Sequence, residues 1–190
     1  MHRSYIFLAQ GFEEIEALTP ADVMRRAGMD VKTVSITASK TVVGAHGIAV
    51  EADMLFKEVD FSGSEWLICP GGMPGASNLA AFAPLCDLLK VHKDKIAAIC
   101  AAPAVVLAPL GLLKGKEATC YPSFEEECAK YGAKMVDKRV VFADKLITGN
   151  GPSSALQFAL AIVAESLGEN VAQEVGAAML LYPKSENYYF

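Results

Sequence analysis

The chain has 190 residues, a length that suits one domain, and we expect that domain to span residues 1–190. Hydrophobic residues make up 53% and charged residues 21%, which excludes a disordered, collagen-like or low-complexity chain. The 17 Lys and Arg against 22 Asp and Glu give a net charge of -5, so the composition offers no basic footprint for a nucleic acid.

The N-terminal apolar run over residues 5–9 is too short for the core of a signal peptide. Residues 96–113 carry no charge and reach the length of a membrane-spanning helix, but Pro103 and Pro109 interrupt them. A buried strand followed by a buried helix fits this segment better. We therefore expect a soluble, cytoplasmic protein without a membrane partner.

The cysteines form no C-x-x-C pair and show no other metal-ligand spacing, so we expect no metal. We also expect no cofactor. Their odd number, in a chain without a secretion signal, indicates free thiols in a reducing compartment. The five are Cys69, Cys86, Cys100, Cys120 and Cys128.

The first half of the chain alternates apolar strands with helical patterns. Residues 5–9 are continuously apolar, as in a strand buried on both faces of a parallel sheet. The helix that begins at Glu13 is expected to break at Pro20, because residues 19–22 resemble a new helix start, and to end at Gly28. A strand over 31–36, a hairpin of 41–43 with 48–50, and a buried strand over 66–69 follow.

The second half continues the alternation. A helix over 78–90, with a break near Pro84, leads to a strand over 96–99. Ser123 and Glu126 have the spacing of a capping box that opens a helix ending at Lys130. The remaining predictions are a turn at 100–102, a helix over 103–110, paired strands over 140–142 and 146–148, and a helix over 154–167.

This alternation predicts a doubly wound α/β fold, in which helices cover both faces of a mostly parallel sheet. Ligands bind such sheets beyond the carboxyl ends of the strands. Three loops at these ends have unusual sequences, over residues 10–16, 70–75 and 100–103.

Cys100 lies between small residues where a strand gives way to a helix, a context similar to that of a nucleophile elbow. The N-terminus of the following helix would lower the pKa of the thiol and favour the nucleophilic thiolate. The alternative is a buried cysteine that only fills space, which is the commoner role of a free cysteine. Cys120 offers a resolving thiol for an oxidised Cys100, or else an unreactive buried position.

Glycines in the 70–75 loop permit positive φ angles and let backbone N–H groups converge on an anion. The loop lacks the spacing of a phosphate or dinucleotide motif, so an ordinary tight turn is the alternative. Beside Cys100, the N–H groups of Gly72 and Ala101 would form an oxyanion hole.

The acidic run of residues 13–16 lies where a loop enters a helix, and such residues commonly complement the helix dipole. Ile15 between carboxylates suggests that Glu14 and Glu16 point in different directions, with one facing inward. A buried glutamate has a raised pKa and donates a hydrogen bond to a thiolate or transfers protons.

Together, three segments resemble the DJ-one/ThiJ/PfpI superfamily: EEIE at 13–16, CPGGMPG at 69–75 and AAICAAP at 97–103. Residues 20–28 and 158–163 extend the resemblance, and Asn187, Tyr188 and Tyr189 are similar to the tail of the bacterial ThiJ/YajL branch.

The resemblance implies a flavodoxin-like, three-layer α/β sandwich, similar to that of the class I glutamine amidotransferases, in a homodimer. It also implies that Cys100 is the nucleophile, that Glu16 is the protonated carboxyl in contact with its sulfur, and that Gly72 and Ala101 supply backbone donors. We expect the substrate contacts to come from Gly71, His46, Tyr121 and Pro152.

The chain departs from the family at two positions. Tyr121 stands where the animal proteins have a histidine, and His46 stands where many members have an arginine. Ala101 follows the cysteine where the PfpI proteases have a histidine, which disfavours proteolysis. Amidotransferase chemistry needs a late histidine, and none follows His92.

The resemblance favours an enzyme that acts on small α-oxoaldehydes or glycated adducts, as a glyoxalase or deglycase, under oxidative or carbonyl stress. The alternatives are a redox sensor or chaperone that turns over no substrate, a role in thiazole monophosphate (thiamine) biosynthesis, and a binding protein whose site has decayed.

Overall fold

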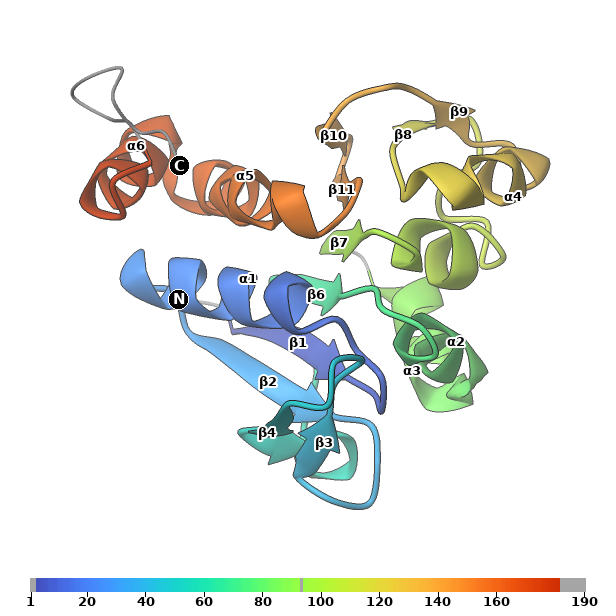
Figure 1. Ribbon diagram of the computed structural model, residues 1–190, viewed down its shortest axis with the longest axis horizontal. Helices are drawn as coiled ribbons and strands as arrows, with labels where there is room; N and C mark the ends of the chain where they lie inside the picture. Colours follow the sequence, from blue (N-terminus) through green and yellow to red (C-terminus); the bar gives the residue numbers. More distant parts are fainter. Residues whose placement is uncertain (1–2, 93, 182–190) are drawn as a thin grey trace.

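A sheet of seven strands forms the centre of the computed structural model, which describes residues 3–92 and 94–181 (Figure 1). Its strands are β1 (Ser4–Leu8), β2 (Val31–Ser35), β5 (Met54–Leu55), β6 (Trp66–Cys69), β7 (Lys95–Ile99), β10 (Val140–Ala143) and β11 (Leu146–Gly149). They follow the order β10-β11-β7-β6-β1-β2-β5, and each neighbouring pair is parallel except β10 with β11. The predicted doubly wound, mostly parallel sheet is confirmed.

Helices cover both faces of this sheet (Figure 1). On one face α1 packs against α5, which packs against α6; on the other, α2 and α4 contact a π-helical segment, Pro103–Leu107. The α-helices are α1 (Glu14–Arg26), α2 (Gly75–Ala81), α3 (Ala83–Val91), α4 (Glu125–Lys130), α5 (Ala155–Leu167) and α6 (Glu169–Ala178). Among the described helices, none is long and apolar enough to cross a membrane.

The apolar run of β1 is continuous because both faces of the strand are buried. Ile6 and Leu8 join the hydrophobic cluster beneath α1 and α5, whereas Tyr5 and Phe7 join the cluster on the opposite face. Successive side chains of a strand point to opposite faces, so a strand between two helical layers has no polar face.

Shorter elements lie outside the central sheet. The predicted hairpin is present as β3 (Thr41–Val43) and β4 (Ala49–Glu51), and a parallel pair is formed by β8 (Glu117–Ala118) and β9 (Lys134–Met135). Single 3₁₀ turns occupy Phe56–Glu58, Pro122–Phe124 and Pro152–Ser154. The sequence analysis missed β5, β8, β9 and α6, and the tail at 187–189 lies outside the described residues.

The predicted break of the first helix at Pro20 is wrong. Helix α1 continues through Pro20, which lacks only the N–H that would have bonded to the preceding turn. Ala17, Pro20, Ala21 and Met24 are all buried. Packing of this face against the sheet and α5 outweighs the lost hydrogen bond.

Two other helix predictions need correction. The segment after Cys100 is π-helical over residues 103–107, with Ala108 N–H donating to the Pro103 carbonyl at 2.9 Å, rather than an α-helix to 110. The capping box is also absent, because Ser123 lies in a 3₁₀ turn and no side chain caps α4. The break near Pro84 is confirmed by the separation of α2 from α3 at Phe82.

We predict that Ser166→Ala lowers the free energy of unfolding by about 1–2 kcal/mol, because it leaves a buried indole N–H without an acceptor. The Nε1 of the fully buried Trp66 donates to Ser166 Oγ at 2.8 Å and ties β6 to α5. Urea unfolding followed by fluorescence of this one tryptophan measures the change. Ser166→Thr keeps the hydroxyl and serves as the control; equal stability of all three proteins would contradict the prediction.

Candidate active site

The three unusual loops meet at the carboxyl end of the sheet, as predicted. The backbone N–H of Glu13 donates to the Gly71 carbonyl at 3.0 Å, and the N–H of Gly75 donates to the Gly11 carbonyl at 3.1 Å. Cys100 follows β7 immediately beside them, since the Cβ of an alanine at position 71 would lie 2.7 Å from Cys100 Cβ.

Cys100 occupies the sharp turn that its sequence context predicts. Its φ is 64°, which is uncommon for a residue other than glycine, and its residual exposure is 8%. Its N–H donates to the Gly149 carbonyl at 2.9 Å and its carbonyl accepts from Tyr121 N–H at 2.8 Å. Hydrogen bonds on both sides therefore hold Cys100 in an unfavourable backbone conformation.

Glu16 is the carboxylate that faces inward, and it is fully buried. Glu13 caps helix α1, its Oε2 accepting from Glu16 N–H at 2.8 Å, and this fixes the turn that carries Glu16. Glu16 Oε2 accepts from Gly71 N–H at 2.9 Å, whereas Oε1 is buried without a partner that satisfies hydrogen-bond geometry among the described residues. The Cys100 thiol lies beside the carboxyl, and hydrogen bonding to it acts to lower the pKa of Glu16.

Burial raises the pKa of Glu16 from its ordinary value of 4.5 to about 7. The negative charge of Glu13 acts in the same direction, and hydrogen bonding to Cys100 and Gly71 opposes both. A buried carboxyl with an unpartnered oxygen is unfavourable as an anion, so the protonated form persists to neutral pH. The expectation of a protonated glutamate at this position is supported.

The expectation of a lowered pKa for the Cys100 thiol is wrong. Burial, together with the charge of Glu16 and hydrogen bonding to it, raises this pKa to about 12, while the N–H groups of Gly72 and Ala101 act to lower it. Burial and the carboxyl of Glu16 outweigh these backbone N–H groups. Between the pKa values of about 7 and about 12, Glu16 and Cys100 therefore hold one proton between them.

Gly71 and Gly72 make this contact geometrically possible. A Cβ at position 71 would lie 2.6 Å from Glu16 Oε2 as well as against Cys100 Cβ. Gly72 has a φ of 83°, and the N–H groups of Gly72 and Ala101 act to lower the pKa of the Cys100 thiol. The two predicted backbone donors therefore lie near this thiol, and their role as an oxyanion hole stays a prediction.

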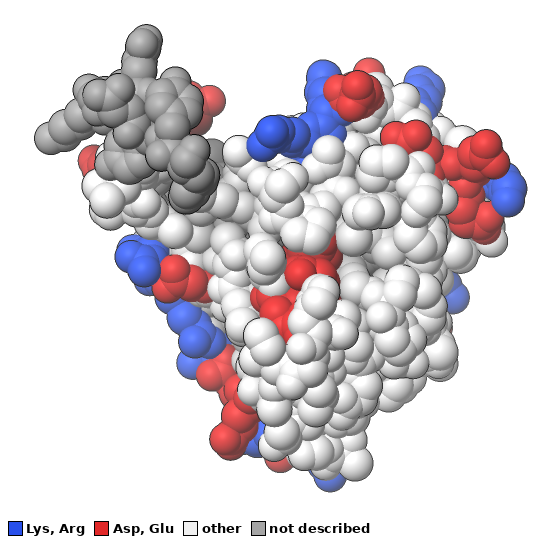
Figure 2. All heavy atoms as spheres, in the orientation of Figure 1, with Lys and Arg blue, Asp and Glu red and all other residues white. Residues whose placement is uncertain are grey.

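Two of the predicted substrate-binding residues, His46 and Pro152, line a common hollow of about 450 Å³. Its other lining residues are Glu13, Glu14, Ile15 and Ile48. Figure 2 shows Asp and Glu side chains at the centre of this face, where the N-terminal end of α1 lies in Figure 1. The ring of Tyr121 lies beside Gly151, which precedes Pro152.

The sequence analysis missed the pairing of Glu14 with His46, because residues 32 positions apart give no local signal. Glu14 Oε1 accepts from His46 N–H at 2.8 Å, and Glu14 Oε2 lies 2.8 Å from His46 Nδ1. Although burial acts to raise the pKa of Glu14, these hydrogen bonds hold it below its ordinary value. Glu13, Glu14 and His46 also bring three metal-binding atoms within 4.8 Å of one another. Hydrogen bonds between Glu14 and His46, and the helix-capping bond of Glu13 to Glu16 N–H, account for this arrangement.

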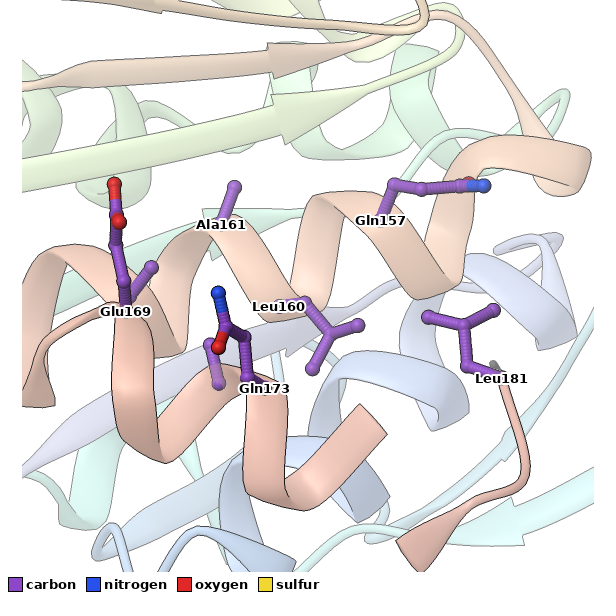
Figure 3. Close-up of a pocket in the computed structure, with 8 residues that line it drawn as sticks. Gln157, Leu160, Ala161, Glu169, Gln173 and Leu181 are labelled. Atoms are coloured by element: carbon purple, nitrogen blue, oxygen red, sulfur yellow. The ribbon is translucent and has the colours of Figure 1, made fainter. Parts of the chain in front are cut away.

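A larger hollow, of about 510 Å³, lies between α5 and α6 (Figure 3). Leu160 and Ala161 of α5 line it together with Gln173 of α6 and Leu181. It contains no residue predicted from the sequence to act in the site.

Comparison with known proteins gives a consistent result. Residues 2–165 match the DJ-1/PfpI family. Protein DJ-1 homolog B of Arabidopsis thaliana is 36% identical over 185 residues, and the glutathione-independent glyoxalase DJR-1.2 of Caenorhabditis elegans is 36% identical over 154 residues. The match to the Arabidopsis protein covers 96% of this chain but 42% of that protein, so the chain spans less than half of its length. The match to the C. elegans protein covers 80% of this chain and 81% of that protein. The structure of oxidised DJ-1 from Toxoplasma gondii has a TM-score of 0.88 at 37% identity, covering 95% of this chain and 98% of that one.

We predict that Glu16→Gln stabilises the fold at pH 8. Folded Glu16 keeps its proton up to about pH 7, whereas the unfolded chain releases it near 4.5, so the free energy of unfolding falls as pH rises through this window. At roughly 1.4 kcal/mol per pKa unit, the cost of ionising Glu16 in the fold is about 3 kcal/mol, which the amide avoids. Urea unfolding at pH 4 and pH 8 tests this: the variant should gain stability at pH 8 only, and a loss at both would contradict it.

Proposed function

We propose, from the premise that the chain belongs to the DJ-1/PfpI family, that it converts α-oxoaldehydes such as methylglyoxal into 2-hydroxy acids without glutathione, with Cys100 as nucleophile. The observation that carries this proposal is the contact of the buried Glu16 carboxyl with the Cys100 thiol. A protonated acid beside a nucleophilic sulfur supplies covalent and general acid–base catalysis at one place. The C. elegans relative named as a glyoxalase supports the same assignment.

In the first step, the Cys100 thiol passes its proton to the Glu16 carboxylate as its sulfur adds to the aldehyde carbon. The carbonyl electrons move to oxygen, and the N–H groups of Gly72 and Ala101, which lie near the thiol, stabilise the oxyanion. Glu16 gives its proton to that oxygen. The product is a neutral hemithioacetal beside a Glu16 carboxylate.

In the second step, the Glu16 carboxylate removes the hydrogen from the former aldehyde carbon and returns a proton to the neighbouring carbonyl carbon. The hydroxyl proton passes to the neighbouring oxygen, so a thioester of the 2-hydroxy acid forms without gain or loss of atoms. Water then cleaves the thioester, which releases the acid and restores the thiol. A carboxyl with a pKa of about 7 is suited to both proton transfers near neutral pH.

The hollow between His46 and Pro152 is the proposed substrate entrance. Its volume of about 450 Å³ exceeds what a three-carbon aldehyde fills, so it also accommodates the amine part of a glycated adduct. Glu13 lines the hollow, and its backbone hydrogen bond to Gly71 links the hollow to the loop that lies against Cys100. We assign substrate contacts to Gly71, His46, Tyr121 and Pro152.

We predict that Cys100→Ser and Glu16→Gln each lower kcat/KM for methylglyoxal by at least ~10²-fold, because one removes the nucleophile and the other the proton carrier. Lactate formation under single-turnover and steady-state conditions measures the effect. Thermal unfolding of each variant confirms that the fold is retained.

Cys86→Ser is the matched control, since Cys86 lies in α3 and outside the candidate site. It should keep the full rate. Turnover by the wild-type protein no faster than by Cys100→Ser would overturn the proposal and favour a redox-sensing role that needs no substrate.

A further inference from the structure

Glu14 is a buried carboxylate that the proposed aldehyde chemistry does not use. Its side chain is 6% exposed, and it lies at the start of α1, two positions before Glu16. Burial acts to raise its pKa, and hydrogen bonds to His46 outweigh this effect, so Glu14 is an anion at neutral pH. The partners that hold this charge come from the turn of the β3–β4 hairpin. Glu14 therefore joins two elements that are far apart in the sequence.

The hairpin turn is shaped to this carboxylate. Glu14 Oε1 accepts from His46 N–H at 2.8 Å and from Ile48 N–H at 3.4 Å, and Glu14 Oε2 lies 2.8 Å from His46 Nδ1. Gly44 leaves room for the approach, since a Cβ at this position would overlap the Glu14 side chain. Three nitrogen atoms and a glycine of the turn thus fit around one side chain of α1.

The two sides of the hairpin are held in different ways. On the β3 side, backbone hydrogen bonds of 2.8 Å link Val43 and Ala45 to the loop before α1. On the other side, the hydrogen bonds that link His46 and Ile48 to α1 all end on Glu14. Among the described residues, Glu14 is thus the tie between α1 and this second side of the turn.

The side of the turn that Glu14 holds is a wall of the hollow proposed as the substrate entrance. His46 and Ile48 line this hollow from the hairpin, and Ile15 lines it from α1. Ile15 and Ile48 are 52% and 55% exposed, so packing in the core does little to fix their separation. The distance between the two apolar walls therefore depends on the side chain that joins their elements, which is Glu14.

We propose that Glu14 is a positioning residue, whose carboxylate fixes His46 and Ile48 as a wall of the hollow and thereby sets the affinity for the aldehyde. This role rests on the proposed function for the identity of the substrate. It deepens that function, because it assigns the shape of the binding site to a residue that forms no bond and carries no proton in the proposed reaction steps.

The carboxylate also orients the His46 ring. With Nδ1 engaged by Glu14, Nε2 is the ring nitrogen left to bind an oxygen atom of the substrate. Hydrogen bonding to Glu14 and its charge raise the pKa of His46 against the effect of burial, and the charge of Glu13 adds to them. Glu13 Oε1 lies 3.9 Å from His46 Nδ1, and Glu13 is the one other titratable group among the described residues that line the hollow.

The first test uses the full chain and needs no substrate. Hydrogen exchange of single amides, followed by NMR, should be at least ~10-fold faster at His46 and Ile48 in Glu14→Ala than in wild type, since both amides lose their acceptor. The Ala45 amide, which donates to the Phe12 carbonyl, should stay protected and show that the fold is retained. Equal exchange at His46 and Ile48 in the two proteins would overturn the inference.

The second test measures methylglyoxal turnover. Glu14→Ala should raise KM about 10-fold while kcat stays within about 2-fold of wild type, because the wall is released but Cys100 and Glu16 stay in place. Gly44→Ala, which crowds the carboxylate from the hairpin side, should have the same effect. Glu51→Gln is the matched control and should keep wild-type kinetics, since it removes an exposed carboxylate of the same hairpin at the end remote from the turn.

Glu14→Gln separates the hydrogen bonds from an effect of packing, because the amide has the shape of the carboxylate but accepts at only one atom. Above the ordinary His46 pKa of 6.5, the amide oxygen accepts from His46 N–H and the amide N–H donates to the neutral ring, so KM should match wild type at pH 8.5. At pH 5.5 the ring is protonated and one of these bonds is lost. The KM should then be at least ~5-fold above that of wild type at the same pH.

These measurements distinguish failure of the positioning role from failure of the proposed function. An unchanged KM in Glu14→Ala, despite faster exchange at His46 and Ile48, would overturn the positioning role and leave the proposed chemistry in place. The same ratio of KM values for Glu14→Gln and wild type at both pH values would also overturn it. Absence of turnover in the wild-type protein would refute the proposed function alone, because amide exchange still decides whether Glu14 holds the wall. If Glu14→Ala does not fold, Gly44→Ala and Glu14→Gln carry the same measurements.

Discussion

The burial of the Glu16 carboxyl against the Cys100 thiol is the interaction on which the site depends. Neither group is stable as an isolated buried anion, so the pair retains one proton over the neutral range. Backbone N–H groups of Gly71, Gly72 and Ala101 partly offset the cost of burying this negative charge. In the proposed function, this loss of stability is the cost of bringing a nucleophile and a proton carrier into contact.

The chain topology explains why these groups meet. The sheet reverses its strand order beside β1 and β6, so the loops after these strands and after β7 converge at one edge. Each loop contributes a different part of the site. The start of α1 carries Glu16, and the turn after β7 carries the Cys100 sulfur. The glycine turn at 71 and 72 leaves room for both side chains and supplies backbone N–H groups. The positive φ of Cys100 is held by Gly149 and Tyr121, which come from segments much later in the chain.

Sequence patterns predicted the sheet and the site components because these depend on local signals. The continuous apolar run of β1, the glycines at 71 and 72, and the small residues around Cys100 each have a direct physical consequence in the structure. Contacts between distant segments gave no such signal, and so the pairing of Glu14 with His46 was not foreseen. The pKa of Cys100 was predicted in the wrong direction because the dipole of a following helix was considered without the opposing carboxyl and burial.

The central claim is that Glu16 retains a proton near neutral pH because it is buried beside Cys100. The most direct measurement is a pH titration of the Glu16 side-chain carboxyl by carbon-13 NMR, with the resonance assigned from its loss in Glu16→Gln. We predict a midpoint near pH 7 rather than near 4.5. A midpoint at the ordinary glutamate value would contradict the account, because Glu16 would then be an anion throughout the neutral range and would have no proton to give.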